Sequence, residues 1–283
     1  MIRIFNMCRG ECYRNQTMSM IKSIRKNHKT PWEMIVLTDM ELAFEEEFPE
    51  VKQIVRPDFI PKKEALTYLK YLPDEWKGER VYHFDSDLLI YDTIPELTGD
   101  FCCTYDWGKD VEDNEYMFTK IADVIKLFED DDPSFRPLDD LLIFVSGVYG
   151  FKYDEKMEKV FEEANWLLTQ YPVDFFRHPL NGSDYTVPEL FLIYVLSKRL
   201  EPLNIDLRYM DYHQVDFKKR KEPGQIIFHY LRTKFLAGGM EKMFELYGRG
   251  EWPVYEGEAR KQLNLDFWKA HGTEDFKGFK VIT

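Results

Sequence analysis

The amino-acid sequence predicts an α/β fold with a central, mostly parallel sheet flanked by helices. Two observations support this class. Short apolar segments with strand character alternate with longer segments whose apolar residues recur at helical spacing. In addition, the apolar segment at residues 81–84 ends abruptly in two carboxylates, Asp85 and Asp87. In sheets of this class, ligands bind at the carboxyl ends of the strands.

The strand predictions rest on runs of apolar, aromatic and β-branched residues bounded by polar turns. The predicted strands are residues 2–5, 32–37, 51–55, 81–84, 101–105, 141–151 and 226–230. Polar loops are expected at residues 6–12 and 74–80. Ser146 and Gly147 interrupt one apolar run, and such small residues allow a ligand to approach the backbone.

The helix predictions rest on apolar spacing and on proline at the first turn. Residues 13–27 carry Met18, Ile21 and Ile24 at helical spacing, and Pro61 and Pro188 stand where a helix tolerates proline. The remaining helices are expected at residues 61–72, 117–128, 155–171 and 187–198. The resulting order of strand, helix, strand, strand, helix, strand is typical of a largely parallel sheet.

Composition narrows the function classes. The chain has 283 residues, of which 44% are hydrophobic, enough for a large core. Its 51 acidic and 38 basic residues give a net charge of -13, which argues against a general nucleic-acid binder but permits a nucleotide in a local basic or metal site. The four cysteines form no disulfide pattern and no run of eighteen apolar residues occurs, so we expect a soluble, cytoplasmic protein.

The Asp85-Ser86-Asp87 tripeptide is the most informative motif. In an extended chain, residues two apart point the same way, so the two carboxylates project together while Ser86 faces away. Two carboxylates this close repel unless a cation or a proton lies between them. Hard oxygen ligands suit Mg²⁺ or Mn²⁺. The structural alternative is a solvated turn or a helix cap, in which short Asp-x-Asp motifs are common.

The sequence resembles the GT-A fold nucleotide-sugar glycosyltransferases, especially the glycogenin and bacterial galactosyltransferase-like family. Four features match in order: Lys70 before the motif strand, Asp85-Ser86-Asp87, Ser146-Gly147, and His229 followed by Lys234. The resemblance covers most of residues 1–235. It departs from the family at Val145, where asparagine is expected, and in the spacing of Lys234, which is one residue closer to its histidine.

The resemblance implies a set of site residues. Asp85, Asp87 and His229 are the metal ligands, and Asp184 and Glu189 are the catalytic candidates. The donor-binding residues are expected to be Asn6, Arg9, Asp39, Lys70, Ser86, Ser146, Gly147 and Lys234, of which Asn6, Arg9 and Asp39 are chosen by their position after the first two strands. The ordinary alternatives are a core histidine for His229, an exposed helix face for Lys70 and a helix cap for Asp184.

The function that the resemblance implies is transfer of a sugar from a nucleotide-sugar, expected to be a UDP-sugar, to a hydroxyl acceptor such as a glycan. An imidazole ligand favours Mn²⁺ over Mg²⁺. Retention is expected from the family; with inversion, Asp184 or Glu189 is the general base. The alternatives are a nucleotidyltransferase that makes nucleotide-sugars, a phosphohydrolase and a non-catalytic nucleotide-binding protein of the same fold.

The domain organisation follows from the same comparison. Residues 1–235 are expected to form the catalytic domain, with a nucleotide-binding half at 1–105 and an acceptor-side half at 106–235. Residues 236–283 are expected to form a C-terminal extension of short helices and loops.

Overall fold

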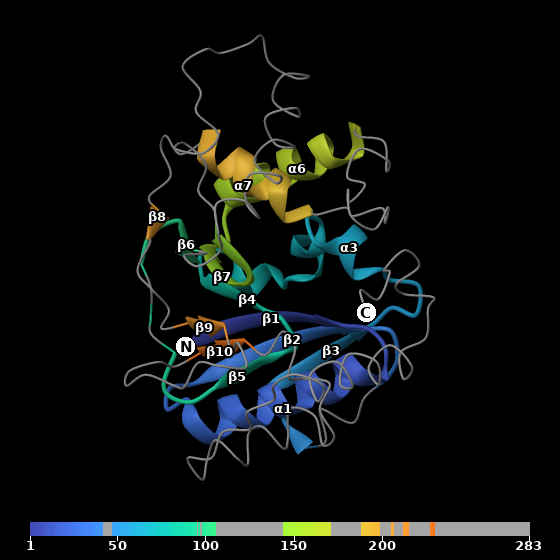
Figure 1. The fold of residues 1–283 in the computed structure, drawn as a ribbon, viewed down its shortest axis with the longest axis vertical. Helices are drawn as coiled ribbons and strands as arrows, with labels where there is room; N and C mark the ends of the chain where they lie inside the picture. Colours follow the sequence, from blue (N-terminus) through green and yellow to red (C-terminus); the bar gives the residue numbers. More distant parts are fainter. Residues whose placement is uncertain are drawn as a thin grey trace, which may run out of the picture.

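The computed structural model of the protein is drawn in Figure 1. It describes residues 1–41, 47–94, 96, 98–105, 144–170, 188–198, 205–206, 212–214 and 227–229. The predicted helix at residues 117–128 and the predicted C-terminal extension at 236–283 lie outside these ranges. The domain boundary at residue 235 therefore stays a prediction.

The described residues form a central seven-stranded sheet in the order β3-β2-β1-β4-β7-β6-β8. Its strands are β1 (Ile2–Cys8), β2 (Trp32–Thr38), β3 (Val51–Val55), β4 (Arg80–Phe84), β6 (Phe101–Tyr105), β7 (Phe144–Lys152) and β8 (Ile205–Asp206). The pairs β3-β2, β2-β1, β1-β4 and β6-β8 are parallel, whereas β7 runs antiparallel to both β4 and β6. The predicted α/β class with a mostly parallel sheet is confirmed.

A second, three-stranded sheet has the order β5-β10-β9. It consists of β5 (Leu88–Ile90), β9 (Tyr212–Gln214) and β10 (Ile227–His229). β5 follows the Asp85-Ser86-Asp87 motif directly, and β10 pairs with it in antiparallel register. β10 lies within the predicted strand at residues 226–230, whereas β5 and β9 were not predicted, because each is only three residues long.

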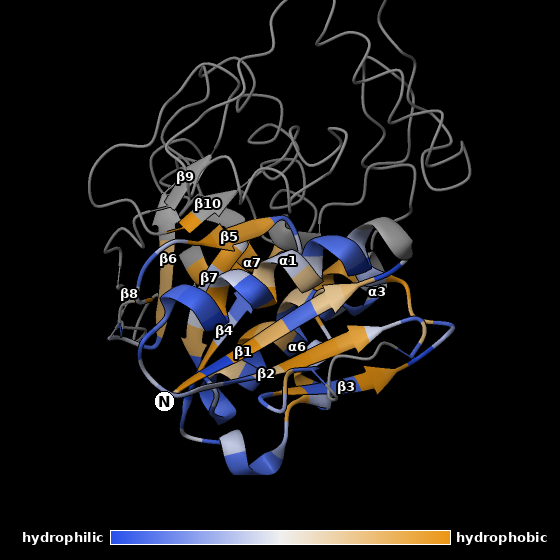
Figure 2. Cartoon of the chain, turned by 90° about the horizontal axis from the view of Figure 1, so that it is seen from below, coloured by the Kyte–Doolittle hydropathy of each residue, from blue (hydrophilic) through white to orange (hydrophobic). Residues whose placement is uncertain are grey.

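The helices cover the two faces of the central sheet (Figure 1). They are α1 (Glu11–Asn27), α3 (Pro61–Glu64), α6 (Glu155–Gln170) and α7 (Pro188–Lys198), with the 3-10 helices η1 (Tyr68–Tyr71) and η2 (Asp74–Trp76). One core layer packs α1 against Ile4, Met34 and Phe84. The other packs α6, α7 and η1 against Phe5, Val81 and Phe151. Burial of both sheet faces accounts for the nearly continuous apolar strands, which are mostly orange in Figure 2.

α1 forms because one helical face is apolar and the charges of its last turn suit the helix dipole. Met20, Ile21 and Ile24 are fully buried against the sheet. Arg25 and Lys26 stand in the last turn, where cations are favourable. The helix starts after Gly10, whose φ of 83° is a conformation that side chains other than glycine rarely adopt. β1 therefore turns sharply into α1 at its carboxyl end.

Two sequence predictions at this level were wrong. Residues 61–72 do not form one helix: α3 ends at Glu64 and η1 begins at Tyr68. The break lets Tyr68 enter the core, where its ring stacks on Phe5 with centroids 4.5 Å apart, so tertiary packing overrides helix propensity. β1 also extends through Cys8, so Asn6 lies inside a strand rather than in a loop.

Among the helices that the structure describes, none combines the length and the apolar character needed to span a bilayer.

Candidate functional site

The candidate site lies at the carboxyl end of β4, in the middle of the central sheet. The backbone N–H of Asp85 donates to the carbonyl of Gly147 over 2.9 Å, and Phe84 pairs with Val148 in the antiparallel register of β4 and β7. The fold therefore brings Gly147, predicted from sequence to line the donor site, directly beside Asp85. Ser146 is its neighbour along β7.

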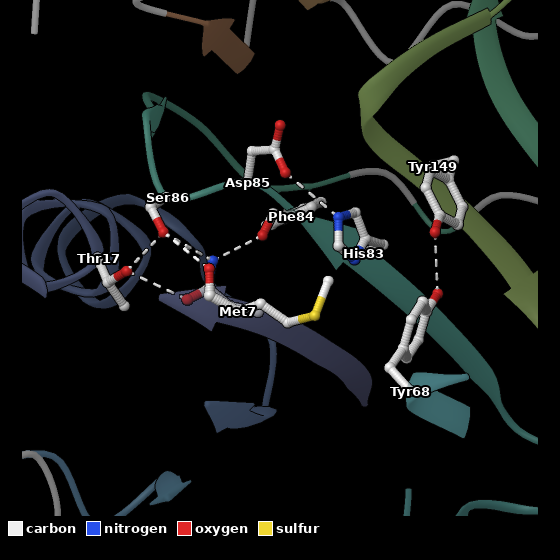
Figure 3. A network of polar contacts seen from close by, with 9 residues as sticks. Met7, Thr17, Tyr68, His83, Phe84, Asp85, Ser86 and Tyr149 are labelled. Carbon is white, nitrogen blue, oxygen red and sulfur yellow. Dashed lines mark hydrogen bonds and ion pairs between the residues drawn. The ribbon is translucent and has the colours of Figure 1, made fainter. Parts of the chain in front are cut away.

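Asp85 and Ser86 direct their side chains to opposite sides of the chain (Figure 3). Ser86 is 5% exposed, and its hydroxyl accepts from Thr17 of α1 at 2.9 Å. It also lies 3.3 Å from both the Asn6 amide and the Met7 carbonyl. Asp85 instead contacts His83 of β4, with its Oδ1 3.3 Å from Nε2. Asp85 and Ser86 thus face opposite ways, as predicted, and Ser86 serves as the internal anchor of the motif; that Asp87 projects together with Asp85 stays a prediction.

Asn6 belongs to the same buried anchor. Its side chain is fully buried; its amide donates to the Phe84 carbonyl at 2.7 Å, and its Oδ1 accepts from Thr17 at 3.1 Å. These contacts hold β1, β4 and α1 together just below the carboxylates. All the contacts described for the Asn6 and Ser86 side chains are internal, and their donor-binding roles stay predictions.

The motif is also held from its other end. Asp87 is 4% exposed and leads into β5. The Ile90 N–H of β5 donates to Ser23 of α1 at 2.9 Å, and Asn27 of α1 donates to the Ile90 carbonyl at 2.7 Å. α1 therefore fixes the strand that follows the two carboxylates.

β10 brings the backbone of His229 to this segment. His229 pairs with Leu88, the residue after Asp87, in the antiparallel register of β10 and β5. Directly opposed residues in antiparallel strands have Cα atoms about 4.5–5.5 Å apart. Two segments separated by some 140 residues in the sequence thus meet beside the carboxylates. The metal-binding role of His229 itself stays a prediction.

Basic and acidic side chains surround the start of α1, next to the carboxyl ends of β1 and β2. Asp39 follows β2; its carboxylate accepts from the Gly10 N–H at 3.2 Å and from Arg14 at 3.1 Å. Arg9 donates to the Phe59 carbonyl at 2.8 Å. Asp39 therefore fixes the turn that enters α1, and a role of Arg9 or Asp39 in nucleoside binding stays a prediction.

Lys70 lies on η1 and is half exposed. Its Nζ is 2.6 Å from Glu64 and lies over the Tyr71 ring, 4.9 Å from the centroid. Partial burial acts to lower the pKa of Lys70, but the hydrogen bond and charge of Glu64 outweigh it and raise the pKa above its usual value. The ammonium is thus charged at neutral pH and already paired with a carboxylate.

His83 is the feature that sequence reasoning missed. It is 6% exposed, and the apolar pattern of residues 81–84 predicted only that it belongs to a strand. The signal was available, because a residue two positions before Asp85 in a strand must lie on the same side as that carboxylate.

The remaining predicted residues are only partly covered. Asp184 and Lys234 lie outside the described residues. Glu189 stands in the first turn of α7, and its predicted catalytic role stays a prediction. Within the described part of the chain, no group of three or more histidine, cysteine or acidic side chains is arranged to hold a metal ion.

The donor chemistry nevertheless fits a divalent cation that shares its coordination with a substrate. Asp85, just after the end of β4, has a carboxylate that is 44% exposed to solvent, and Asp87 follows two residues later with a buried side chain. Mg²⁺ and related ions are commonly held by one or two carboxylates together with phosphate oxygens. Two protein carboxylates are therefore sufficient for this kind of site, without a third protein ligand among the described residues.

Comparison with solved structures identifies the fold. The chain is similar to the galactosyltransferase LgtC crystallised with donor and acceptor sugar analogs, at 14% identity and a TM-score of 0.56, over 92% of this chain and 99% of that one. It is also similar to the apo form of the glycosyltransferase GlyE from Streptococcus pneumoniae TIGR4, at 11% identity and a TM-score of 0.54, over 95% of this chain and 64% of that one.

An active-site mutant of LgtC matches to the same extent, with 14% identity and a TM-score of 0.55. No protein-family model and no curated protein matches the sequence. At these identities the likeness shows the fold, and the protein therefore has the GT-A glycosyltransferase fold that the sequence predicts.

Proposed function

We propose that the protein is a metal-dependent glycosyltransferase that moves a sugar from a nucleotide-sugar, most simply a UDP-sugar, to a hydroxyl acceptor such as a glycan, with retention. One observation carries the proposal. Asp85 and Asp87 are held at the carboxyl end of β4 in a GT-A fold, next to Gly147 and to the strand that bears His229. The similar enzyme LgtC was crystallised with donor and acceptor sugar analogs.

In this proposal Asp85 and Asp87 hold the divalent cation, and His229 completes the protein ligands. A bound cation neutralises the negative charge that develops on the diphosphate as the glycosidic bond breaks. The imidazole of His229 favours Mn²⁺ over Mg²⁺ among the available ions. The antiparallel pairing of β10 with β5 supports this ligand set, because it brings the His229 backbone beside Leu88, the residue after Asp87.

Lys70 and Lys234 supply further positive charge for the diphosphate in this proposal. Lys70 is paired with Glu64 at 2.6 Å and stays protonated, so the donor phosphates compete with Glu64 for the same ammonium. In the proposal the donor sugar lies next to the small residues Ser146 and Gly147, which allow a ligand to approach the backbone. Asp184 and Glu189 are the proposed catalytic residues; with inversion, one of them takes the acceptor proton.

The first experiment is calorimetric titration of UDP, GDP and CDP into the wild type, with and without Mn²⁺, and into Asp87→Asn. We expect one nucleotide to bind only with Mn²⁺ and to lose at least tenfold in affinity in Asp87→Asn, because the amide removes the ligand's charge but keeps its shape. Asp74→Asn is the matched control. Its carboxylate is 95% exposed on η2, which leads into the opposite end of β4, so its binding should match the wild type.

The same titrations separate the alternatives. Metal-independent binding, or equal binding by Asp87→Asn, would show that the two carboxylates are structural and would remove the glycosyltransferase proposal. If nucleotide binds as expected, the wild type is then incubated with the matching nucleotide-sugars. Release of nucleoside diphosphate that increases with added hydroxyl compounds supports transfer, whereas formation of a nucleotide-sugar from a nucleoside triphosphate and a sugar phosphate supports the nucleotidyltransferase alternative.

A further inference from the structure

His83 is a buried histidine that touches the candidate metal site without being one of its expected ligands. It lies two residues before Asp85 on β4, and its Nε2 is 3.3 Å from Oδ1 of that carboxylate (Figure 3). Because a carboxylate only accepts hydrogen bonds, Nε2 is assigned as the donor in this contact. Within the described part of the chain, buried Nδ1 has no hydrogen-bond partner.

The surroundings of the imidazole are aromatic. The ring of Tyr149 stacks on it with centroids 4.9 Å apart at 20°, and the ring of Tyr68 lies at 5.5 Å. The two tyrosine hydroxyls bond to each other at 3.1 Å (Figure 3) rather than to His83. Burial, together with its partner Tyr149, raises the pKa of Tyr68 well above the usual value, so this side of the imidazole is apolar and uncharged.

A histidine is an unfavourable choice for this slot if stability alone is considered. The orphaned Nδ1 carries a desolvation cost, and a phenylalanine would fill the same space between the aromatic rings. The hydrogen bond to Asp85 compensates little, because that carboxylate is 44% exposed and water can replace the imidazole donor. Residues that lower stability in this way are typical of functional sites, where activity is kept at a cost in stability.

We propose that His83 is a positioning residue for the cation: its Nε2–H holds one oxygen of Asp85 and leaves the other for a divalent metal. Hydrogen bonds from a second layer orient metal ligands in this way and keep them in one rotamer. The inference rests on the metal site of the proposed function. It adds His83 to that site, a residue outside the Asp85-Ser86-Asp87 motif. Its role depends on an N–H at one place and not on the charge of the imidazole.

The test compares His83→Phe, which keeps the aromatic stacking and removes the N–H, with His83→Gln, whose side-chain amide restores an N–H at a similar reach. Mn²⁺ affinity is measured with UDP present, from the electron paramagnetic resonance signal of free Mn²⁺. We expect His83→Phe to bind Mn²⁺ about tenfold more weakly. The Mn²⁺ affinity of His83→Gln should stay within about threefold of the wild type. That is less than the loss typical when a hydrogen-bond partner of a metal ligand is removed.

A second readout excludes a purely structural role. The urea midpoint of unfolding, measured without metal, should not fall in His83→Phe. Tyr149→Phe should lower that midpoint, because it removes the buried hydrogen bond to Tyr68. The Mn²⁺ affinity of Tyr149→Phe should equal that of the wild type. If His83→Phe does not fold, His83→Met fills the same apolar space without an N–H and takes its place.

The outcomes are distinct from those for the function. Equal Mn²⁺ binding by His83→Phe and the wild type, while Asp87→Asn binds weakly, overturns the role of His83 and leaves the glycosyltransferase proposal standing. Equally weak binding by His83→Phe and His83→Gln also overturns it, because the N–H then does not decide affinity. If the wild type shows no Mn²⁺-dependent nucleotide binding, both proposals fail.

Discussion

Ser86 and Asp85 are neighbours in the chain, yet their side chains serve opposite sides of the sheet. Ser86 is tied to Thr17 beneath α1, and Asp85 reaches His83 in the aromatic layer under η1 (Figure 3). β4 ends at Phe84 and the chain turns at Ser86 and Asp87, so the step from Asp85 to Ser86 links the exposed carboxylate to the internal anchor.

Gly150 is another residue whose identity is decided by its immediate neighbours. A Cβ at this position in β7 would lie 2.8 Å from Sγ of Cys102 and 3.0 Å from the Tyr82 ring. We expect Gly150→Ala to lower the free energy of unfolding by about 1–3 kcal/mol, the usual cost of overpacking a core. The measurement is urea unfolding followed by fluorescence.

The matched control for this prediction is the double variant Gly150→Ala with Cys102→Ala, which removes the closest atom. It should recover part of the loss relative to the sum of the two single variants. Equal stability of Gly150→Ala and the wild type would mean that Cys102 and Tyr82 give way easily enough to admit a methyl group. The close approach of their side chains to Gly150 would then have no energetic consequence.

At the level of elements, α1 organises the site. Its middle residues hold the Asp85-Ser86-Asp87 motif through Thr17, and its last turns hold β5 through Ser23 and Asn27. One rigid helix thereby fixes both sides of the motif. Anchoring a site to a helix and strands, rather than to loops, holds its ligands in place more accurately.

Thr17→Val tests this anchor. Thr17 is fully buried, and its hydroxyl lies 2.9 Å from Ser86 and 3.1 Å from Asn6. The isosteric valine removes this buried hydroxyl donor, so we expect the free energy of unfolding to fall by about 1–3 kcal/mol in urea titrations. Ser19→Ala is the control, because among the described residues the Ser19 hydroxyl bonds within α1, to the Asn15 carbonyl at 3.1 Å, and its loss should cost under about 0.5 kcal/mol.

For the whole molecule, the buried titratable groups define a pH range of greatest stability. Burial lowers the pKa of His28 from 6.5; its Nδ1 accepts from the Ile94 N–H at 3.0 Å. The fold thus favours neutral His28, and this contribution is complete above pH 6.5 and is lost as the pH falls below it. Burial raises the pKa of Cys8 from 9.0 to about 11, so its contribution is complete below pH 9.0 and is lost between there and about 11.

We therefore expect a stability plateau between about pH 6.5 and 9, with decline on both sides. The measurement is the urea midpoint across this range and one and a half units beyond each end. His28→Gln, whose amide oxygen can still accept, should flatten the decline towards pH 5, where carboxylates are still ionised. Cys8→Ala should flatten the alkaline limb. Unchanged slopes in both variants would assign the pH dependence to other groups.

The α/β class, most strand positions and the Asp85-Ser86-Asp87 motif could be predicted from the amino-acid sequence, because apolar periodicity and strand alternation are local properties. Residues 51–55 and 101–105, for example, were predicted with the observed limits. The tertiary structure alone decided how residues 61–72 divide, because burying Tyr68 against Phe5 outweighed helix propensity. It also decided the meeting of β10 with β5 and the contact of His83 with Asp85 in its aromatic setting. Such pairings depend on segments far apart in the chain, whose contact free energies no local pattern records.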